Sequence, residues 1–161
     1  MIPEAMFTYR QPRPSVCADV AIFAENQLCL IHRGKEPYRM HVALPGGHVD
    51  PGSDGFGELI ADAAVREVEE ELGVFITPSQ LNFVGIYDTP RRDPRGWRIS
   101  VLYMVMLSSQ PELQAGDDAA TAFWADLDDF LLKRHFAFDH EQLVKDAIDL
   151  YKMKKGEGGI A

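Results

Sequence analysis

Apolar residues gather in short runs along the chain, separated by stretches rich in glycine, proline and charge. These runs are rich in β-branched and aromatic side chains, which is typical of buried strands. They predict long strands at residues 16–24, 27–33, 81–89 and 97–107, and shorter ones at residues 42–44 and 121–125. Only Glu25 and Asn26 separate the first two runs, which favours a tight hairpin.

Two other stretches repeat their apolar residues at helical spacing. The first, residues 60–72, is followed by Gly73, a residue suited to the left-handed conformation that ends many helices. The second begins after Asp139, whose carboxylate is expected to cap the helix while Gln142 closes a capping box. Helices flanking mostly antiparallel strands predict an α+β fold with a mixed sheet between helices.

The 161 residues, 46% of them hydrophobic and 25% charged, are enough for one soluble domain with a core. We expect an N-terminal arm at residues 1–15, a single domain at 16–155 and a C-terminal tail at 156–161. A net charge of −9 argues against non-specific binding to nucleic acid, which needs a surplus of cations. No apolar run is long enough to span a membrane.

The cysteines and the first residues bear on the cellular compartment. Cys17 and Cys29 are too few for a disulfide framework and lie out of register across the expected hairpin. The first residues lack the basic start and apolar stretch of a secretory signal. We therefore expect reduced thiols and a cytoplasmic protein.

The first predicted helix carries the candidate chemistry. At about 100° per residue, Glu67, Glu70 and Glu71 fall on one face of the helix. A second face is apolar and should point into the core; it consists of Ala61, Val65, Val68 and Leu72. Carboxylates at spacings of three and four repel one another. Hard oxygen ligands packed in this way suit Mg²⁺ or Mn²⁺, which would remove the repulsion.

Taken alone, such a helix is better interpreted as one with a solvated acidic face. The residues around it in the sequence favour a metal site instead. Pro45-Gly46-Gly47 precedes it, and glycines allow close approach of the backbone to a ligand. Glu58 lies eight residues before Arg66, and Gly73 follows the acids. The combination is far more specific than any of its parts.

This stretch resembles the Nudix box: glycine, five residues, glutamate, seven residues, Arg-Glu, an aliphatic residue, any residue, Glu-Glu, any residue, glycine and an aliphatic residue. Glu58 through Val74 match the second part of the pattern without a break. The resemblance extends over most of residues 16–150. It implies an α/β/α sandwich and an enzyme that cleaves a pyrophosphate bond in a nucleoside diphosphate compound.

The glycine that opens the box can be aligned in two ways. Counted literally, Gly52 precedes Glu58 by the required distance. If Pro45-Gly46-Gly47 is instead the family's lead-in, residues 53–57 are an insertion, and we prefer this alignment. The role of Glu58 is then less secure than those of the three helix glutamates. On an ideal helix it would face away from them, so it must precede the regular helix if it contributes.

The resemblance also assigns roles. Glu67, Glu70 and Glu71 would coordinate Mg²⁺ (Mn²⁺ is possible), a main-chain carbonyl near Gly46 would complete the site, and Arg66 would orient the glutamates. Bound metal would neutralise the pyrophosphate and lower the pKa of a water molecule. Family members take the catalytic base from the box or from a later loop. The candidates left open here are Glu67, Glu58, Asp117 and Asp118.

The segment between the strands predicted at residues 81–89 and 97–107 is the candidate substrate loop. It carries three arginines, Arg91, Arg92 and Arg95, between Tyr87 and Trp97. Guanidinium groups bind phosphate bidentately and aromatic rings stack on bases, so the loop suits an anionic ligand bearing a ring. The alternative is a rigid turn whose arginines pair with local acids.

Pro90 narrows the choice of substrate. It follows Val74 by sixteen residues, an offset that within the family is associated with ADP-ribose pyrophosphatases. The resemblance therefore implies hydrolysis of ADP-ribose to AMP and ribose 5-phosphate. A sugar nucleotide or an oxidised nucleoside triphosphate is the next alternative.

Two further functions remain open: a non-catalytic Nudix domain that senses a nucleotide, and an interaction domain with a solvated acidic helix. The intact set of box glutamates speaks against the first. Phe7, Tyr9 and Arg10 in the arm are suited to reach a substrate or a second subunit, so a homodimer is also open.

Overall fold

The computed structural model describes residues 10–116, 118–127 and 134–157. Its strands are β1 (Ser15–Ala24), β2 (Gln27–Arg33), β3 (Val42–Ala43), β4 (Gly46–His48), β5 (Asn82–Tyr87), β6 (Arg98–Leu107) and β7 (Ala119–Asp126). Its helices are α1 (Ile60–Leu72), the short 3₁₀ helix η2 (Pro78–Gln80) and α2 (His140–Glu157). In the residues described, no helix is long and apolar enough to cross a bilayer. Asp117 and the arm residues Phe7 and Tyr9 lie outside the described part.

The strands form one mixed sheet, as the sequence predicts. The main path runs β3-β2-β1-β6-β5, with β4 paired to β1 and β7 paired to β2. β1 and β6 run parallel over their whole length, and the other described pairs are antiparallel. Glu25 and Asn26 make the predicted hairpin turn between β1 and β2, both with positive φ (52° and 62°).

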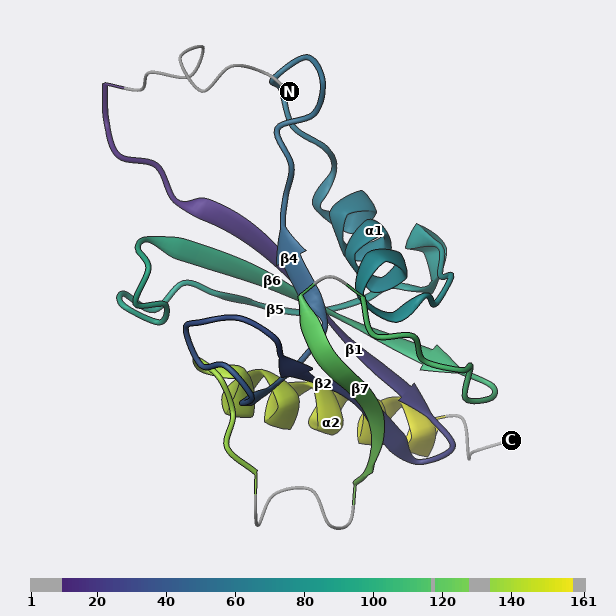
Figure 1. Cartoon of the computed structure of the whole chain (residues 1–161). Coiled ribbons are helices and arrows are strands. Elements are labelled where there is room, and N and C mark those ends of the chain that lie inside the picture. The colour runs from purple at the N-terminus through teal and green to yellow at the C-terminus, as the bar shows by residue number, and fades with distance from the viewer. Residues whose placement is uncertain (1–9, 117, 128–133, 158–161) are drawn as a thin grey trace.

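The two α-helices cover opposite faces of the sheet (Figure 1). Successive side chains of a strand point to opposite faces. Accordingly Val20 and Ile22 of β1 pack in the cluster that contains α1, and Ala21 and Phe23 pack in the cluster that contains α2. This burial on both faces explains why β1 is a nearly continuous apolar run. The expected α/β/α arrangement is confirmed.

Helix α1 has the predicted bounds and ends at Gly73, which is left-handed with φ 64°. The last turn of α1 is held by the loop before β7, because the amides of Gln114 and Gly116 donate to the carbonyls of Leu72 and Glu71. Val68 and Leu72 are fully buried, whereas Ala61 and Val65 are only half-buried. The loop and the core together fix where the acidic face of α1 lies.

Several predicted boundaries need correction. β4 lies in the glycine-rich stretch that sequence predicts as loop, and β5 starts after η2. α2 extends to Glu157, and the division of the chain into arm, domain and tail stays a prediction. The capping box at Asp139 is also wrong. The Asp139 carboxylate accepts two hydrogen bonds from Arg92, and the Gln142 side chain donates to Asp146 instead.

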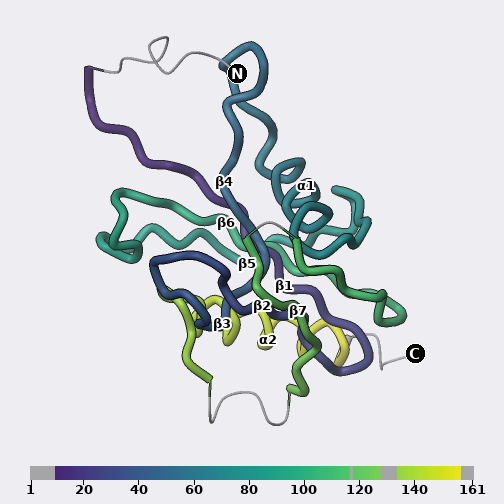
Figure 2. The backbone as a smooth tube through the Cα atoms, in the orientation of Figure 1, coloured from purple at the N-terminus to yellow at the C-terminus, as the bar shows by residue number. Residues whose placement is uncertain are grey.

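The segment that leads into α2 is tied to β3. Val42 donates its amide to the carbonyl of His135 and accepts a bond from the amide of Ala137. Figure 2 shows these two stretches of chain side by side. This pairing brings the start of α2 to the edge of the sheet at β3.

Truncating the core face of α1 should destabilise the protein. We expect Leu72→Ala to lower the free energy of unfolding by about 2–5 kcal/mol, because it leaves a cavity in a closed core. Leu59→Ala is the matched control, since Leu59 is 71% exposed and should change stability by less than about 0.5 kcal/mol. Urea unfolding measures both, and equal losses would contradict the packing described here.

Candidate active site

One guanidinium lies at the centre of the candidate site. Arg66 of α1 donates through Nε and Nη2 to the two carboxylate oxygens of Glu58, at 3.2 and 2.6 Å. Its Nη1 donates to Glu67 and to Glu70, at 3.0 and 3.2 Å, and Nη2 also reaches the carbonyl oxygen of His48 at 2.9 Å. The network raises the pKa of Arg66 above its ordinary value, chiefly through Glu58. One side chain thus connects α1, β4 and the segment before the helix.

Glu58 lies before the first turn of α1, which is the position that a contribution from it requires. Besides the two bonds from Arg66, it accepts one from the amide of Asp50 at 2.8 Å. The hydrogen bonds from Arg66 hold its pKa below the ordinary value. Because its oxygens are engaged in this way, Glu58 acts in the structure as the fixed partner of Arg66.

Glu71 is the most buried of the three helix carboxylates. It is 6% exposed, and its Oε2 accepts a hydrogen bond from the amide of Gly46 at 3.0 Å. Burial raises the pKa of Glu71 to about 8 despite that bond. The contact shown at Gly46 is therefore made by its N–H, and the role expected for its carbonyl stays a prediction.

Glu67 and Glu70 differ from Glu71 in exposure. Burial raises the pKa of Glu67, whose side chain is 14% exposed, whereas the Glu70 side chain is 55% exposed. A methyl group at Gly47 would collide with the carboxylate of Glu67. Gly47 thus lets β4 lie directly against Glu67, whereas a methyl group at Gly46 would collide with β1 at Ala18 and Asp19.

The three glutamates line one pocket together with Asp118 and Lys35. Hard oxygen donors gathered beside one another suit Mg²⁺ or Mn²⁺ in type and charge. Arg66 competes for Glu67 and Glu70. Within the described residues, no three His, Cys, Asp or Glu side chains converge as a complete metal-binding group. The donor chemistry fits a divalent cation, and Arg66 holds two of the three carboxylates through Nη1.

A neighbouring cavity extends from Glu71 and Gly46 toward the arginine-rich loop. Arg92 and Arg95 line it, and both are paired with acids. Arg92 binds Asp139 through two bonds of 2.8 and 2.6 Å, and Arg95 binds Asp93 through bonds of 3.0 and 2.7 Å. The structure therefore supports both alternatives that the sequence leaves open: local ion pairs, and arginines that face a cavity.

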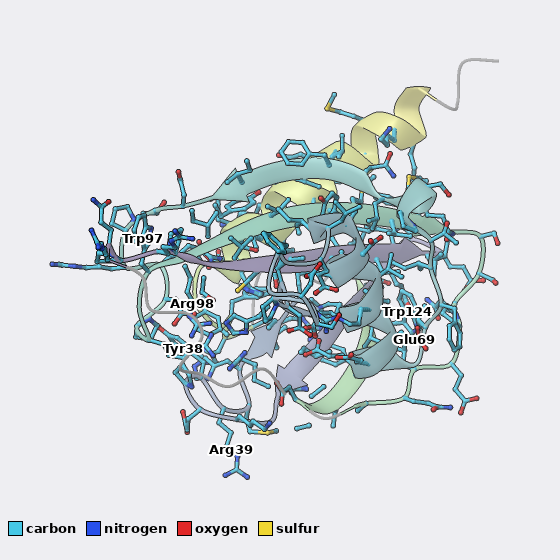
Figure 3. The ribbon with its side chains drawn as sticks, turned by 90° about the horizontal axis from the view of Figure 1, so that it is seen from above. Tyr38, Arg39, Glu69, Trp97, Arg98 and Trp124 are labelled. Carbon is cyan, nitrogen blue, oxygen red and sulfur yellow. The ribbon has the colours of Figure 1, made fainter. Side chains whose placement is uncertain are left out.

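The remaining candidates of the loop lie elsewhere. Tyr87 donates its hydroxyl to Asp146 of α2 at 2.7 Å and does not line the cavity. Pro90, Arg91 and Trp97 line a second, more apolar pocket. Trp97 is 57% exposed and lies at one side of the molecule, with Glu69 labelled at the other (Figure 3). Asp93 borders both pockets, so they adjoin.

Three residues that sequence reasoning missed line the central cavity: Asp19, Arg33 and His140. Arg33 and Arg95 both place their guanidinium groups over the ring of Phe138, at 4.8 and 5.1 Å. Burial, helped by Arg95, lowers the pKa of Arg33. A signal for Asp19 was available, because it is the only charged residue in the apolar run 16–24.

Comparison with known proteins agrees with this geometry. The family model of the NUDIX domain matches residues 13–147. The chain belongs to the Nudix family. It is 39% identical to an ADP-ribose pyrophosphatase of Methanocaldococcus jannaschii, over 83% of this chain and 72% of that protein. These two matches identify it as a Nudix pyrophosphohydrolase.

Two other relatives are longer than this chain, and a third is of similar length. It is 33% identical to the ADPR-responsive transcriptional repressor NtrR of Acinetobacter baylyi, over 84% of this chain and 54% of the repressor. A MutT/nudix family protein from Enterococcus faecalis shares 27% identity and a TM-score of 0.78, over 89% of this chain and 64% of that one. The Nudix domain of Shewanella oneidensis NrtR, solved with ADP-ribose, shares the fold (TM-score 0.77, 24% identity, 94% of both chains).

The pH dependence of stability should report the buried charge on Glu71. Its pKa is raised on folding, so its contribution is fully present below about pH 4.5 and is lost as the pH rises through about 8. Glu71→Gln keeps an acceptor for Gly46 and carries no charge. In chelator at pH 8.5 we expect this variant to be more stable than the parent, by about 1–2 kcal/mol or roughly 2–8 °C.

At pH 5 the gain should disappear. Glu69→Gln is the matched control, because Glu69 is exposed on the same helix, and it should show no such difference. Thermal melts at both pH values provide the measurement. A Glu71→Gln protein that is less stable than the parent at pH 8.5 would contradict the raised pKa.

Proposed function

We propose that the protein hydrolyses ADP-ribose to AMP and ribose 5-phosphate in a Mg²⁺-dependent reaction. The observation that carries this proposal is that carboxylates and guanidinium groups line one cavity. Glu71 and the β4 glycines border it, and so do Arg33 and Arg95. A pyrophosphate needs both a site for its counter-cation and cationic side chains for its oxygens. The 39% identity to an ADP-ribose pyrophosphatase supports the choice of substrate.

Glu67, Glu70 and Glu71, with the carbonyl of Gly46, are the groups that would hold Mg²⁺ or Mn²⁺. The bound ion would supply charge neutralisation and a more acidic water. Arg66 holds Glu67 and Glu70 in place through Nη1, and Gly46 holds Glu71 through its amide. Arg33 and Arg95 are assigned to the phosphate oxygens.

The candidates for the catalytic base are carboxylates that border the site. Glu67 and Asp118 line the glutamate pocket, and Asp118 forms an ion pair with Lys35. Glu58 is the weaker candidate, because Arg66 and the amide of Asp50 already engage both of its oxygens.

The second pocket is assigned to the nucleoside. Its lining of Pro90, Trp97 and Ile99 offers an apolar surface and an exposed indole, and Arg91 lies at its border. Bases stack on aromatic rings at a gain of about 1–3 kcal/mol each. Since Asp93 borders both pockets, one ligand can place its base here and its pyrophosphate in the central cavity.

A second candidate function is nucleotide sensing without catalysis. The observation in its favour is the similarity to the ADPR-responsive repressor, which this chain matches over 54% of the repressor's length. The intact glutamates favour hydrolysis, because a domain that only binds does not require them. Turnover measurements separate the two functions directly.

The main experiment is a hydrolysis panel with Mg²⁺. It includes ADP-ribose, NADH, diadenosine compounds, sugar nucleotides and nucleoside triphosphates, with products identified. We expect ADP-ribose to be preferred and Glu67→Gln to lower kcat by about 100-fold or more. Glu69→Gln on the exposed side of α1 should keep full activity. Tight ADP-ribose binding without products would instead support the sensor.

Removing the indole should weaken substrate binding. We expect Trp97→Ala to raise KM for ADP-ribose by about 5- to 100-fold with little change in kcat, because stacking acts before the chemical step. Trp97→Phe keeps an aromatic surface and serves as the control. Steady-state kinetics of both variants give KM and kcat. An unchanged KM in Trp97→Ala would show that the nucleoside does not bind in this pocket.

A further inference from the structure

Two polar side chains that line the central cavity, Asp19 and His140, have no role in the function proposed above. Asp19 lies within β1, and His140 is the first residue of α2. They are 7% and 6% exposed, and both line the cavity that Glu71 and Arg95 also border. Buried polar groups normally have hydrogen-bond partners, so the partners of these two are informative.

Each side chain is held by one hydrogen bond, and one further polar atom of each has no hydrogen bond. Ser100 donates its hydroxyl to Oδ2 of Asp19. Nδ1 of His140 accepts a hydrogen bond from the amide of Leu44 at 3.0 Å. Since Nδ1 is an acceptor, the ring proton of the neutral imidazole is on Nε2. Burial also lowers the pKa of His140, which favours this neutral form.

The two remaining atoms face each other across a gap. Nε2 of His140 is 4.0 Å from Oδ1 of Asp19, which is too far for a hydrogen bond between them. Within the described residues neither atom has another hydrogen-bond partner. A donor and an acceptor are thus held by separate elements, both nine-tenths buried and both at the cavity.

A hydroxyl group satisfies both atoms at once, because it accepts from an N–H and donates to a carboxylate. A phosphate oxygen does not, since it would bring negative charge against Asp19. We propose that Asp19 and His140 form a sugar-binding subsite that takes a ring hydroxyl of the ribose beyond the pyrophosphate. This assignment rests on the proposed function and extends it from the pyrophosphate to the second sugar.

The subsite gives a physical reason for substrate choice. A ligand that lacks the hydroxyl leaves a buried carboxylate oxygen and a buried N–H unpaired, which costs affinity. A ligand with a terminal phosphate in this place meets Asp19. Ribose 5-phosphate is therefore preferred over deoxyribose phosphates, and ADP-ribose over nucleoside triphosphates.

The test compares three small ligands by calorimetry in Mg²⁺ buffer: ribose 5-phosphate and its 2-deoxy and 3-deoxy analogues. We expect the parent protein to bind ribose 5-phosphate about 10- to 100-fold more tightly than at least one analogue. In Asp19→Asn this preference should fall below about threefold, because the amide replaces one acceptor oxygen by a donor. An equal preference in parent and variant overturns the subsite, as does the lack of any preference in the parent.

Two more variants keep the test decisive. His140→Gln can still accept from Leu44 and should lose the same preference, so it replaces Asp19→Asn if that protein does not fold. Glu141→Gln is the matched control, because Glu141 is next to His140 but pairs with Lys145 on the outer face of α2. It should keep the full preference.

Hydrolysis of ADP-ribose is measured separately with the same variants. If the preference for ribose depends on Asp19 but the protein does not hydrolyse ADP-ribose, the subsite is supported and the proposed hydrolysis is refuted. If the protein hydrolyses ADP-ribose and Asp19→Asn leaves the KM unchanged, the proposed hydrolysis is supported and the subsite is refuted.

Discussion

The site depends on one guanidinium that is shared by several carboxylates. Arg66 joins Glu58, Glu67, Glu70 and the carbonyl of His48, so the segment before α1, the helix itself and β4 meet at one side chain. Such an arrangement suits arginine, whose five donors lie in one rigid plane. Without it, a helix with three acids on one face would repel itself and the neighbouring strand. With it, the acids are held close together while Glu71 enters a buried environment.

The fold brings cations from other parts of the chain to the cavity that Glu71 borders. Arg33 ends β2, and Arg95 precedes β6. Both stack on Phe138, from the segment before α2. The cavity therefore collects groups that lie far apart in sequence. Acids supplied by a helix, one arginine from the end of a strand and one from a loop provide the two kinds of charge that a pyrophosphate requires.

Sequence predicts those features that depend on local periodicity. The face shared by Glu67, Glu70 and Glu71 follows from helical geometry alone, and Gly73 marks the helix end because few other residues adopt its conformation. β4 escapes prediction because its residues, Gly46 to His48, carry no apolar pattern. They join the sheet only through β1.

Long-range polar contacts are the features that sequence does not reveal. The carboxylate of Asp139 is a good local cap, yet a buried arginine from another element takes it. Asp19 and His140 likewise acquire meaning only when β1 and α2 are brought together. Local sequence indicates which hydrogen-bond partners a residue can have, and tertiary contacts decide which of them it binds.

The parallel pairing of β1 with β6 has a practical consequence. Both strands start at the same end, where the amide of Ser15 bonds the carbonyl of Trp97. Residues 10–14, which lead into β1, therefore lie on the side of the molecule that also carries Trp97. Changes to this segment would bear on the pocket proposed for the nucleoside.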